Sequence, residues 1–337
     1  MQPGVAVVTG ASAGVGRATT RALARSGFDV AVLARGIAGL RAAASDVELT
    51  GRRALAIPTD VSEYAQVADA AEQVEAELGP IDVWVNNAMT TVFAWFTDVQ
   101  PDEFARTTAV TYLGQVYGTM VALEHMQPRD RGRIVNVGSA LAFAGLPLQS
   151  AYCGAKFACR GFTQAVRAEL LARHSNITIS LVHLPAVNTP QFEWCLSRME
   201  REPMPVPPVY QPEVVAEKIV AAALTGRRSK VVGGWNRAVV AAGRLAPSVA
   251  AQFAARTGID SQQTDEPRRR DRRADLCDPV DVESDYGARG RFDERAQGMR
   301  DVAWLRTLPR TGITLVRSIG AAAREAVTRD SAATAGR

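Results

Sequence analysis

The stretch GVAVVTGASAGVGR, residues 4–17, decides the fold class of this 337-residue chain. It begins with the apolar run VAVV at 5–8, which is typical of a buried parallel strand. A turn with the spacing T-G-x-x-x-G-x-G follows, and an alanine-rich helical pattern begins at about residue 14. Glycines at such a turn let the backbone approach a phosphate, whose charge the N–H groups of the helix amino terminus stabilise. We therefore expect a nucleotide-phosphate site formed by Gly10, Ser12, Gly14, Val15 and Gly16.

The same alternation of strand and helix continues along the chain. Further apolar runs stand at 30–33, 54–57, 81–85, 133–137 and 177–182. Helical patterns cover about 14–26, 36–49, 62–78, 101–127, 149–174 and 211–225, and a last strand is predicted at 230–235. Strict alternation predicts an α/β fold, a Rossmann-type doubly wound parallel sheet with right-handed crossovers. We expect this single catalytic domain to span residues 1–236.

The pattern changes beyond about Trp235. Residues 237–257 predict an alanine-rich helix that is broken at Pro247, and residues 265–310 mix acidic and basic side chains with few apolar anchors. Such a composition predicts irregular chain without a core of its own. A terminal segment at 311–330 regains weak helical spacing. We therefore expect a partly helical C-terminal extension over residues 237–337.

Charge does not call for a nucleic-acid partner. The formal net charge is +4 and the pI is about 9.0. Five arginines between residues 268 and 273 form a basic cluster, but acidic side chains neighbour them and no aromatic residue is interleaved. We interpret this cluster as a solvated linker rather than a nucleic-acid surface.

Cysteine spacing and hydropathy argue for a reduced, cytoplasmic protein. The four cysteines form no C-x-x-C pair, and together with three histidines they show no metal-ligand spacing, so we expect no metal. No secretory signal is visible, and no apolar run approaches the roughly 20 residues that cross a bilayer. The terminal helical segment leaves two alternatives open: weak peripheral membrane contact, or packing on this domain or on a second subunit.

The end of the second strand predicts which nucleotide is bound. In dinucleotide folds this position lies beside the adenosine ribose, where an acid accepts bonds from the hydroxyls of NAD and a cation accommodates the phosphate of NADP. Here the strand is followed by Arg35, and no acid appears until Asp46. Charge matching therefore favours NADP. The alternative is that Arg35 merely begins an exposed helix.

Tyr152 and Lys156 predict acid-base chemistry. They stand four residues apart in the helical pattern SAYCGAKFACRGF, which puts both side chains on one face. A nearby ammonium and an oxidised nicotinamide would both lower the pKa of the phenol, which would then exchange a proton with a substrate oxygen. Ser139 follows the strand at 133–137, at the sheet edge where ligands bind, and could hold that oxygen. A half-buried tyrosine beside a surface lysine is the alternative.

Four motifs in this order resemble the short-chain dehydrogenase/reductase family: the glycine turn, Asn86-Asn87-Ala88, Ser139, and the Y-x-x-x-K of Tyr152 and Lys156. The resemblance covers about residues 4–235. It implies a nicotinamide cofactor and reversible alcohol/carbonyl chemistry with Ser139, Tyr152 and Lys156 as the working residues. The cofactor contacts that it implies involve Asp60, Val61, Asn87, Ala88, Tyr152, Lys156 and Thr189.

Several positions depart from the family pattern. Met89 replaces a glycine near the cofactor, and Leu184 and Pro185 stand where a proline-glycine pair is usual. Thr111 stands where relatives carry an asparagine that helps hold a water linked to the lysine. We keep Thr111 as a catalytic candidate because its hydroxyl, or the local carbonyl, can hold such a water.

We therefore expect an NADP-dependent oxidoreductase that acts on a ketone or secondary alcohol of moderate size and apolar character. The aromatic and methionine residues of 93–99 and 191–210 predict an apolar pocket, unless they serve as core or subunit contacts. A non-catalytic nucleotide-binding sensor or scaffold with the same fold is the alternative. By resemblance, we also expect a homo-oligomer.

Overall fold

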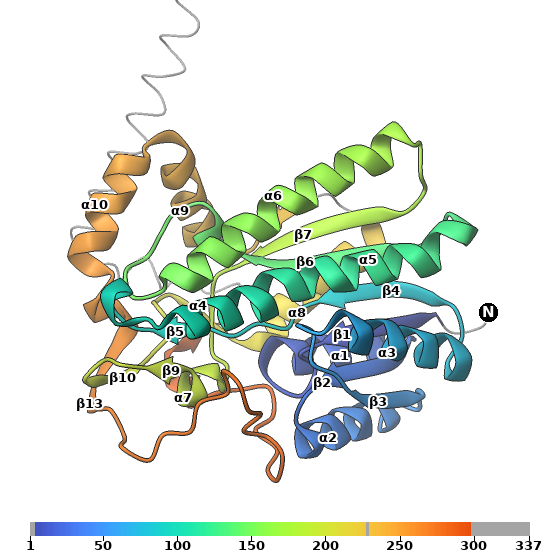
Figure 1. The fold of residues 1–337 in the computed structure, drawn as a ribbon, viewed down its shortest axis with the longest axis horizontal. Helices are drawn as coiled ribbons and strands as arrows, with labels where there is room; N and C mark the ends of the chain where they lie inside the picture. The colour runs from blue at the N-terminus through green and yellow to red at the C-terminus, as the bar shows by residue number, and fades with distance from the viewer. Residues whose placement is uncertain (1–3, 227–228, 298–337) are drawn as a thin grey trace, which may run out of the picture.

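A seven-stranded, all-parallel sheet forms the centre of the computed structural model, which describes residues 4–226 and 229–297 (Figure 1). The strand order is β12-β7-β6-β4-β1-β2-β3. The bounds are β1 (Val5–Thr9), β2 (Asp29–Ala34), β3 (Ala54–Pro58), β4 (Ile81–Asn86), β6 (Arg133–Ser139), β7 (Thr178–Leu184) and β12 (Ser229–Val231). This order confirms the predicted Rossmann-type doubly wound sheet.

Helices cover both faces of the sheet. Alternate residues of one strand face opposite sides, so Ala6 and Val8 belong to one buried cluster, whereas Val5 and Val7 belong to the other. The first cluster is covered by α1 (Gly14–Arg25), α2 (Ile37–Glu48) and α8 (Pro212–Thr225). The second is covered by α3 (Tyr64–Glu77), α5 (Gly114–Met126) and α6 (Ser150–Ala172).

The long helix predicted at 101–127 is divided. It consists of α4 (Pro101–Thr108), a π-helical turn (Ala109–Leu113) and α5. Pro101 begins α4, and Gln100 with Glu103 forms a capping box at this end. The π-helical turn contains Thr111, so the backbone departs from α geometry at a predicted site residue.

The carboxyl end of the sheet carries the remaining elements. Short strands are β5 (Val92–Phe93), β8 (Ala186–Val187), β9 (Leu196–Ser197), β10 (Arg201–Pro203), β11 (Val209–Tyr210), β13 (Gln263–Pro267) and β14 (Ala296–Gln297). The helices are α7 (Gln191–Trp194), α9 (Gly234–Leu245) and α10 (Pro247–Thr257). The predicted break at Pro247 is confirmed, since this residue begins α10. The predicted strand at 230–235 is wrong in its second half, because β12 ends at Val231 and α9 begins at Gly234.

Residues 268–295, here called the strap, connect β13 to β14. Figure 1 shows the strap in orange, running from β13 toward the end of the sheet that carries β2. It is largely irregular, as expected, but Leu276, Ala288 and Phe292 are buried against the domain. Residues 298–310 and the terminal helical segment at 311–330 lie outside the described residues.

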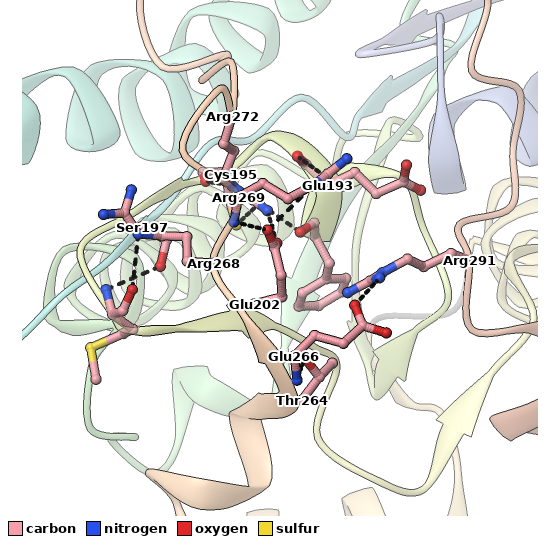
Figure 2. Close-up of polar contacts among 12 residues, drawn as sticks. Glu193, Cys195, Ser197, Glu202, Thr264, Glu266, Arg268, Arg269, Arg272 and Arg291 are labelled. Carbon is pink, nitrogen blue, oxygen red and sulfur yellow. Dashed lines mark hydrogen bonds and ion pairs between the residues drawn. The ribbon is translucent and has the colours of Figure 1, made fainter.

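The arginine cluster anchors the start of the strap. Glu202, on β10, is buried and forms ion pairs with Arg272 and with Arg269, the latter at 3.2 Å (Figure 2). Burial raises the pKa of Glu202, but the hydrogen bonds and charges of the two arginines outweigh it, and the pKa falls below its usual value. The side chain of Arg272 is only 3% exposed, so the interpretation as a solvated linker is wrong for this residue. Its role is to bind the strap to the domain.

Candidate active site

One cavity of about 640 Å³ opens at the carboxyl end of the sheet. It extends from the turn after β1 to the beginning of α6, and onward to α9 and α10. The predicted site residues that line it are Gly10, Ser12, Gly14, Val15, Arg35, Asp60, Val61, Asn87, Ala88, Ser139, Tyr152, Lys156 and Thr189. Gly16 and Thr111 do not line it. Residues that are distant in sequence therefore share one space.

The glycine turn is shaped by steric necessity. Gly10 and Gly14 adopt φ angles of 63° and 58°, in the left-handed region that side chains disfavour. A Cβ atom on Gly16 would lie 2.0 Å from the carbonyl oxygen of Gly10. All three positions thus need glycine, and the turn can bring backbone close to a nucleotide phosphate at the beginning of α1.

Asn87 fixes this turn to the end of β4. Its side-chain nitrogen donates to the carbonyl oxygens of Thr9, at 3.0 Å, and Gly10, at 3.2 Å. In return, the backbone N–H groups of Asn87 and Ala88 donate to the Thr9 hydroxyl. The N-N-A motif is therefore part of the scaffold that holds the turn, besides lining the cavity.

The predicted acid-base residues lie together. Lys156 Nζ lies 5.6 Å from the centre of the Tyr152 ring and donates to the carbonyl oxygen of Val137 at 2.8 Å. Ser139 is the last residue of β6, and its hydroxyl accepts a hydrogen bond from the Leu141 N–H at 3.1 Å. Figure 1 shows α6 lying beside β6 and β7.

Burial is the main influence on the pKa values of Tyr152 and Lys156. It raises the pKa of Tyr152 well above its ordinary value, although the hydrogen bond with Ser139 acts in the opposite direction. Burial also lowers the pKa of Lys156. The expectation that Lys156 and an oxidised nicotinamide together lower the pKa of Tyr152 stays a prediction.

Thr111 is fully buried behind the cavity. Its hydroxyl donates to the carbonyl oxygen of Thr90 at 2.8 Å and accepts from the Thr90 N–H at 3.0 Å. The thiol of Cys159 donates to the Thr111 carbonyl oxygen at 3.3 Å. Both groups that could hold a water thus have protein partners, and the part of Thr111 in a proton relay stays a prediction.

Asp60 lines the cavity, but its carboxylate is engaged with the protein. One oxygen accepts from Arg106 at 2.6 Å and the other from the backbone and hydroxyl of Ser62. Burial raises the pKa of Asp60, but these hydrogen bonds outweigh it and hold the pKa below its usual range. A contact with adenine stays a prediction for this residue.

Arg35 lines the cavity at the end of β2, and its partners come from the strap. The guanidinium donates to the carbonyl oxygen of Cys277 at 2.6 Å and to that of Asp275. Asp275, Pro279, Val280 and Asp281 line the same cavity. These strap residues were not predicted from the sequence, because no local spacing connects them with the end of β2, and Asp275 lies 240 residues after Arg35.

The other half of the cavity is apolar. Its side chains include Leu141, Leu146, Phe192, Trp194, Met204, Trp235, Val239 and Phe253. The region 191–210 thus lines the cavity, as predicted. The aromatic residues of 93–99 do not: Phe93 is buried in a separate cluster, whereas Trp95 and Phe96 are exposed.

Within residues 4–226 and 229–297, two kinds of feature are absent. No helix in these ranges is both long and apolar enough to span a membrane. No group of three or more His, Cys, Asp or Glu side chains in them is arranged to hold a metal ion.

Comparison with known sequences identifies relatives. A family model described as short chain dehydrogenase matches residues 4–197. The chain is 32% identical over 265 residues to the uncharacterised oxidoreductase YxnA of Bacillus subtilis, covering 78% of this chain and 74% of that protein. It is 30% identical over 240 residues to the 3-ketodihydrosphingosine reductase of Bos taurus, covering 67% of this chain and 70% of that protein.

Solved structures share the fold. A short-chain dehydrogenase/reductase from Burkholderia phymatum in complex with NAD superposes with a TM-score of 0.65 at 22% identity, covering 72% of this chain and 92% of that one. An alcohol dehydrogenase from Thermococcus sibiricus, complexed with 5-hydroxy-NADP, gives a TM-score of 0.59 at 24% identity, covering 68% and 94%. Together with the sequence matches, these likenesses show that the chain belongs to the short-chain dehydrogenase/reductase family of oxidoreductases.

Proposed function

We propose that this protein transfers hydride between NADP(H) and a ketone or secondary alcohol, with Tyr152 as the acid-base group. One observation carries the proposal: Tyr152, Lys156 and Ser139 line the same continuous cavity as the glycine turn. The residues fit a nicotinamide dinucleotide, because Gly10 and Gly14 present no side chain to the phosphates and the cavity extends from them to Tyr152. When bound, this cofactor supplies or accepts the hydride.

The chain's own residues supply the proton. In the reducing direction, the Tyr152 hydroxyl donates its proton to the substrate oxygen, which the Ser139 hydroxyl holds by a hydrogen bond. The Lys156 ammonium then stabilises the phenolate that is left. A phenol of ordinary pKa carries its proton at neutral pH, so the resting group can donate it in the reducing direction. Solvent must return the proton, and Thr111 is our candidate to position the water that does so.

Arg35 supports NADP(H) over NAD(H). Its guanidinium lies at the end of β2, where a cation accommodates the 2′-phosphate of the adenosine ribose. The structural relatives do not decide this choice, since one is a complex with NAD and the other a complex with an NADP derivative.

The apolar half of the cavity supports a substrate with a sizeable hydrocarbon part. Phe192, Trp194, Met204 and Phe253 are among its side chains, and burying a hydrocarbon chain there removes apolar surface from water. Relatives named 3-ketodihydrosphingosine reductase and 3-dehydrosphinganine reductase, at 30% and 32% identity, agree with a ketone as the reacting group.

A direct assay tests the proposal. Purified protein is mixed with NADPH and a series of ketones with increasing alkyl-chain length, and oxidation of the cofactor is followed. We expect turnover that improves with chain length. Tyr152→Phe should lower kcat by about 100-fold or more while NADPH still binds. Tyr64→Phe, an exposed tyrosine on α3, is the matched control and should retain wild-type turnover.

Two outcomes would contradict the proposal. Tyr152→Phe with wild-type kcat would remove the assigned role of the phenol. Tight NADPH binding without turnover of any ketone or alcohol would favour the alternative, a non-catalytic sensor or scaffold with the same fold.

A further inference from the structure

The strap brings an acid to the carboxyl end of β2, where the strand itself has none. We infer that Asp281 is a specificity-determining residue for the nucleotide: its carboxylate accepts hydrogen bonds from the adenosine ribose hydroxyls and opposes a 2′-phosphate. This inference rests on the proposed function, since it concerns the same nucleotide site, but it assigns a role to a segment outside the matched family region of residues 4–197.

Asp281 lies against the beginning of α2, immediately after Arg35. Its carboxylate occupies the space in which side chains at Gly36 and Gly39 would lie, because a Cβ on either glycine would come within 1.7 Å and 2.4 Å of its oxygens. Its own carbonyl oxygen accepts from the Gly39 N–H at 3.3 Å. Because Gly36 and Gly39 have no side chains, the Asp281 carboxylate fits beside the position that contacts the adenosine ribose in this fold.

Contacts on both sides of Asp281 hold the strap in place. Before it, the carbonyl oxygens of Leu276 and Cys277 accept from Arg106, at 2.9 Å, and from Arg35, at 2.6 Å. After it, the Asp285 carboxylate pairs with the buried Arg17 at 3.0 Å, and the Gly287 carbonyl oxygen accepts from the Gly14 N–H at 3.1 Å. The strap therefore spans the nucleotide end of the cavity, from the end of β2 to the glycine turn.

The carboxylate of Asp281 needs donors that the described residues do not supply. Asp281 is 7% exposed and lines the cavity, yet none of its hydrogen bonds within residues 4–226 and 229–297 involves a carboxylate oxygen. Its oxygens are not among the fully buried polar atoms that lack a partner, so they reach the cavity, where a ligand can donate to them. Two ribose hydroxyls would satisfy the carboxylate, whereas the 2′-phosphate of NADP would bring a second anion to the same place.

The charged side chains near the end of β2 have opposite effects on the preference for NADPH. Arg35 is the cation that favours the phosphate, and two of its nitrogens already donate to strap carbonyl oxygens. Asp275 faces the same cavity and receives a 3.5 Å hydrogen bond from the Thr90 hydroxyl. Asp281 and Asp275 therefore oppose the preference that Arg35 provides, and the protein binds NADPH less selectively than Arg35 alone would allow.

The test compares NADPH and NADH binding to the full-length wild type, to Asp281→Asn and to Asp278→Asn by direct titration. Asp278 lies three residues earlier, is exposed, and does not line the cavity, so it controls for the loss of one negative charge. We expect Asp281→Asn to raise the ratio of NADPH to NADH affinity by about tenfold, mainly through tighter NADPH binding. Asp278→Asn should change this ratio by less than about twofold.

An unchanged ratio in Asp281→Asn would overturn the inference. Equal loss of both affinities would also overturn it, because it would indicate a purely structural role for the strap. Wild-type protein that binds neither nucleotide would refute the proposed function itself, and the inference with it. Wild-type binding of both with an unaltered ratio in the variant would refute only the inference.

A measurement on the wild type keeps the test independent of the variant's folding. Hydrogen exchange of the strap amides from 280 to 287 is compared in saturating NADH and saturating NADPH. We expect stronger protection with NADH, because its ribose hydroxyls bind Asp281 and the 2′-phosphate repels it. Equal protection, or stronger protection with NADPH, would overturn the inference.

Discussion

At the residue scale, the site places ionisable groups where burial rather than pairing controls them. Lys156 is buried and Tyr152 is half-buried, and burial shifts both pKa values toward the neutral forms. Asp275 shows the same effect at the nucleotide end: burial raises its pKa to about 7, the charge of Arg35 acts against this rise, and the charge of Asp281 adds to it. Burial thus favours the neutral forms of these three groups, whereas Arg106 and Ser62 lower the pKa of Asp60 in the same cavity.

Asp275 gives the stability of the protein a predictable pH dependence. Its folded-state pKa lies above that of an unfolded aspartate, so the folded state holds the proton more tightly. The stabilisation is complete below about pH 4 and is lost as pH rises through about 7. Asp275→Asn mimics the protonated form. We expect this variant to lose the contribution of Asp275 to the pH dependence of the free energy of unfolding, measured with urea between about pH 4 and pH 8.

The control for this experiment is Asp278→Asn, since Asp278 is exposed on the same segment. It should keep the wild-type pH dependence. A wild-type slope in Asp275→Asn would show that Asp275 is not protonated in the folded protein.

At the element scale, the packing of the strap on α2 should reverse the usual stabilising effect of replacing a helical glycine with alanine. Glycine within a helix is about 1 kcal/mol less favourable than alanine. Gly161 on α6 is exposed with open space around it, so Gly161→Ala should raise the free energy of unfolding by about this amount. Gly39→Ala should lower it instead, because its methyl group would collide with the Asp281 carboxylate and with Ser12.

A double-mutant cycle identifies the strap as the cause. Asp281→Ala removes the carboxylate, so Gly39→Ala should cost less in that background than in the wild type. Chemical unfolding of the four proteins measures the difference. An equal loss of unfolding free energy on Gly39→Ala in the wild type and in Asp281→Ala would show that the strap does not pack on α2 in solution.

At the scale of the whole molecule, local sequence patterns predicted the parallel sheet, the helices that alternate with its strands, and many of the residues that line the cavity. The strand-turn-helix at Gly10 and the one-turn spacing of Tyr152 and Lys156 are local, and parallel strands bring their carboxyl ends to one edge. The position of the strap was not predictable in this way. It depends on the ion pair between Arg272 and Glu202 and on the fit of Asp281 to Gly36, contacts between residues far apart in sequence.

The assembly and the domain division stay predictions. We expect a homo-oligomer through α5 and α6, and exposed apolar side chains on these helices, Met120, Phe157 and Leu171, are consistent with a covered surface there. The hydrogen bonds and ion pairs of the strap lie at the carboxyl end of the sheet, with α1, α2, α4, α7, α8, β8 and β10 or their adjoining turns.

The most direct test of the central claim follows the hydride itself. NADPH deuterated at its hydride-donating carbon, in each of the two stereochemical forms, is mixed with the wild-type protein and a long-chain ketone, and the alcohol is analysed by mass spectrometry. The account predicts an alcohol that carries one deuterium from one of the two forms, and a strongly reduced yield with Tyr152→Phe. An alcohol without deuterium from either form, or no alcohol from any ketone while NADPH is bound, would contradict it.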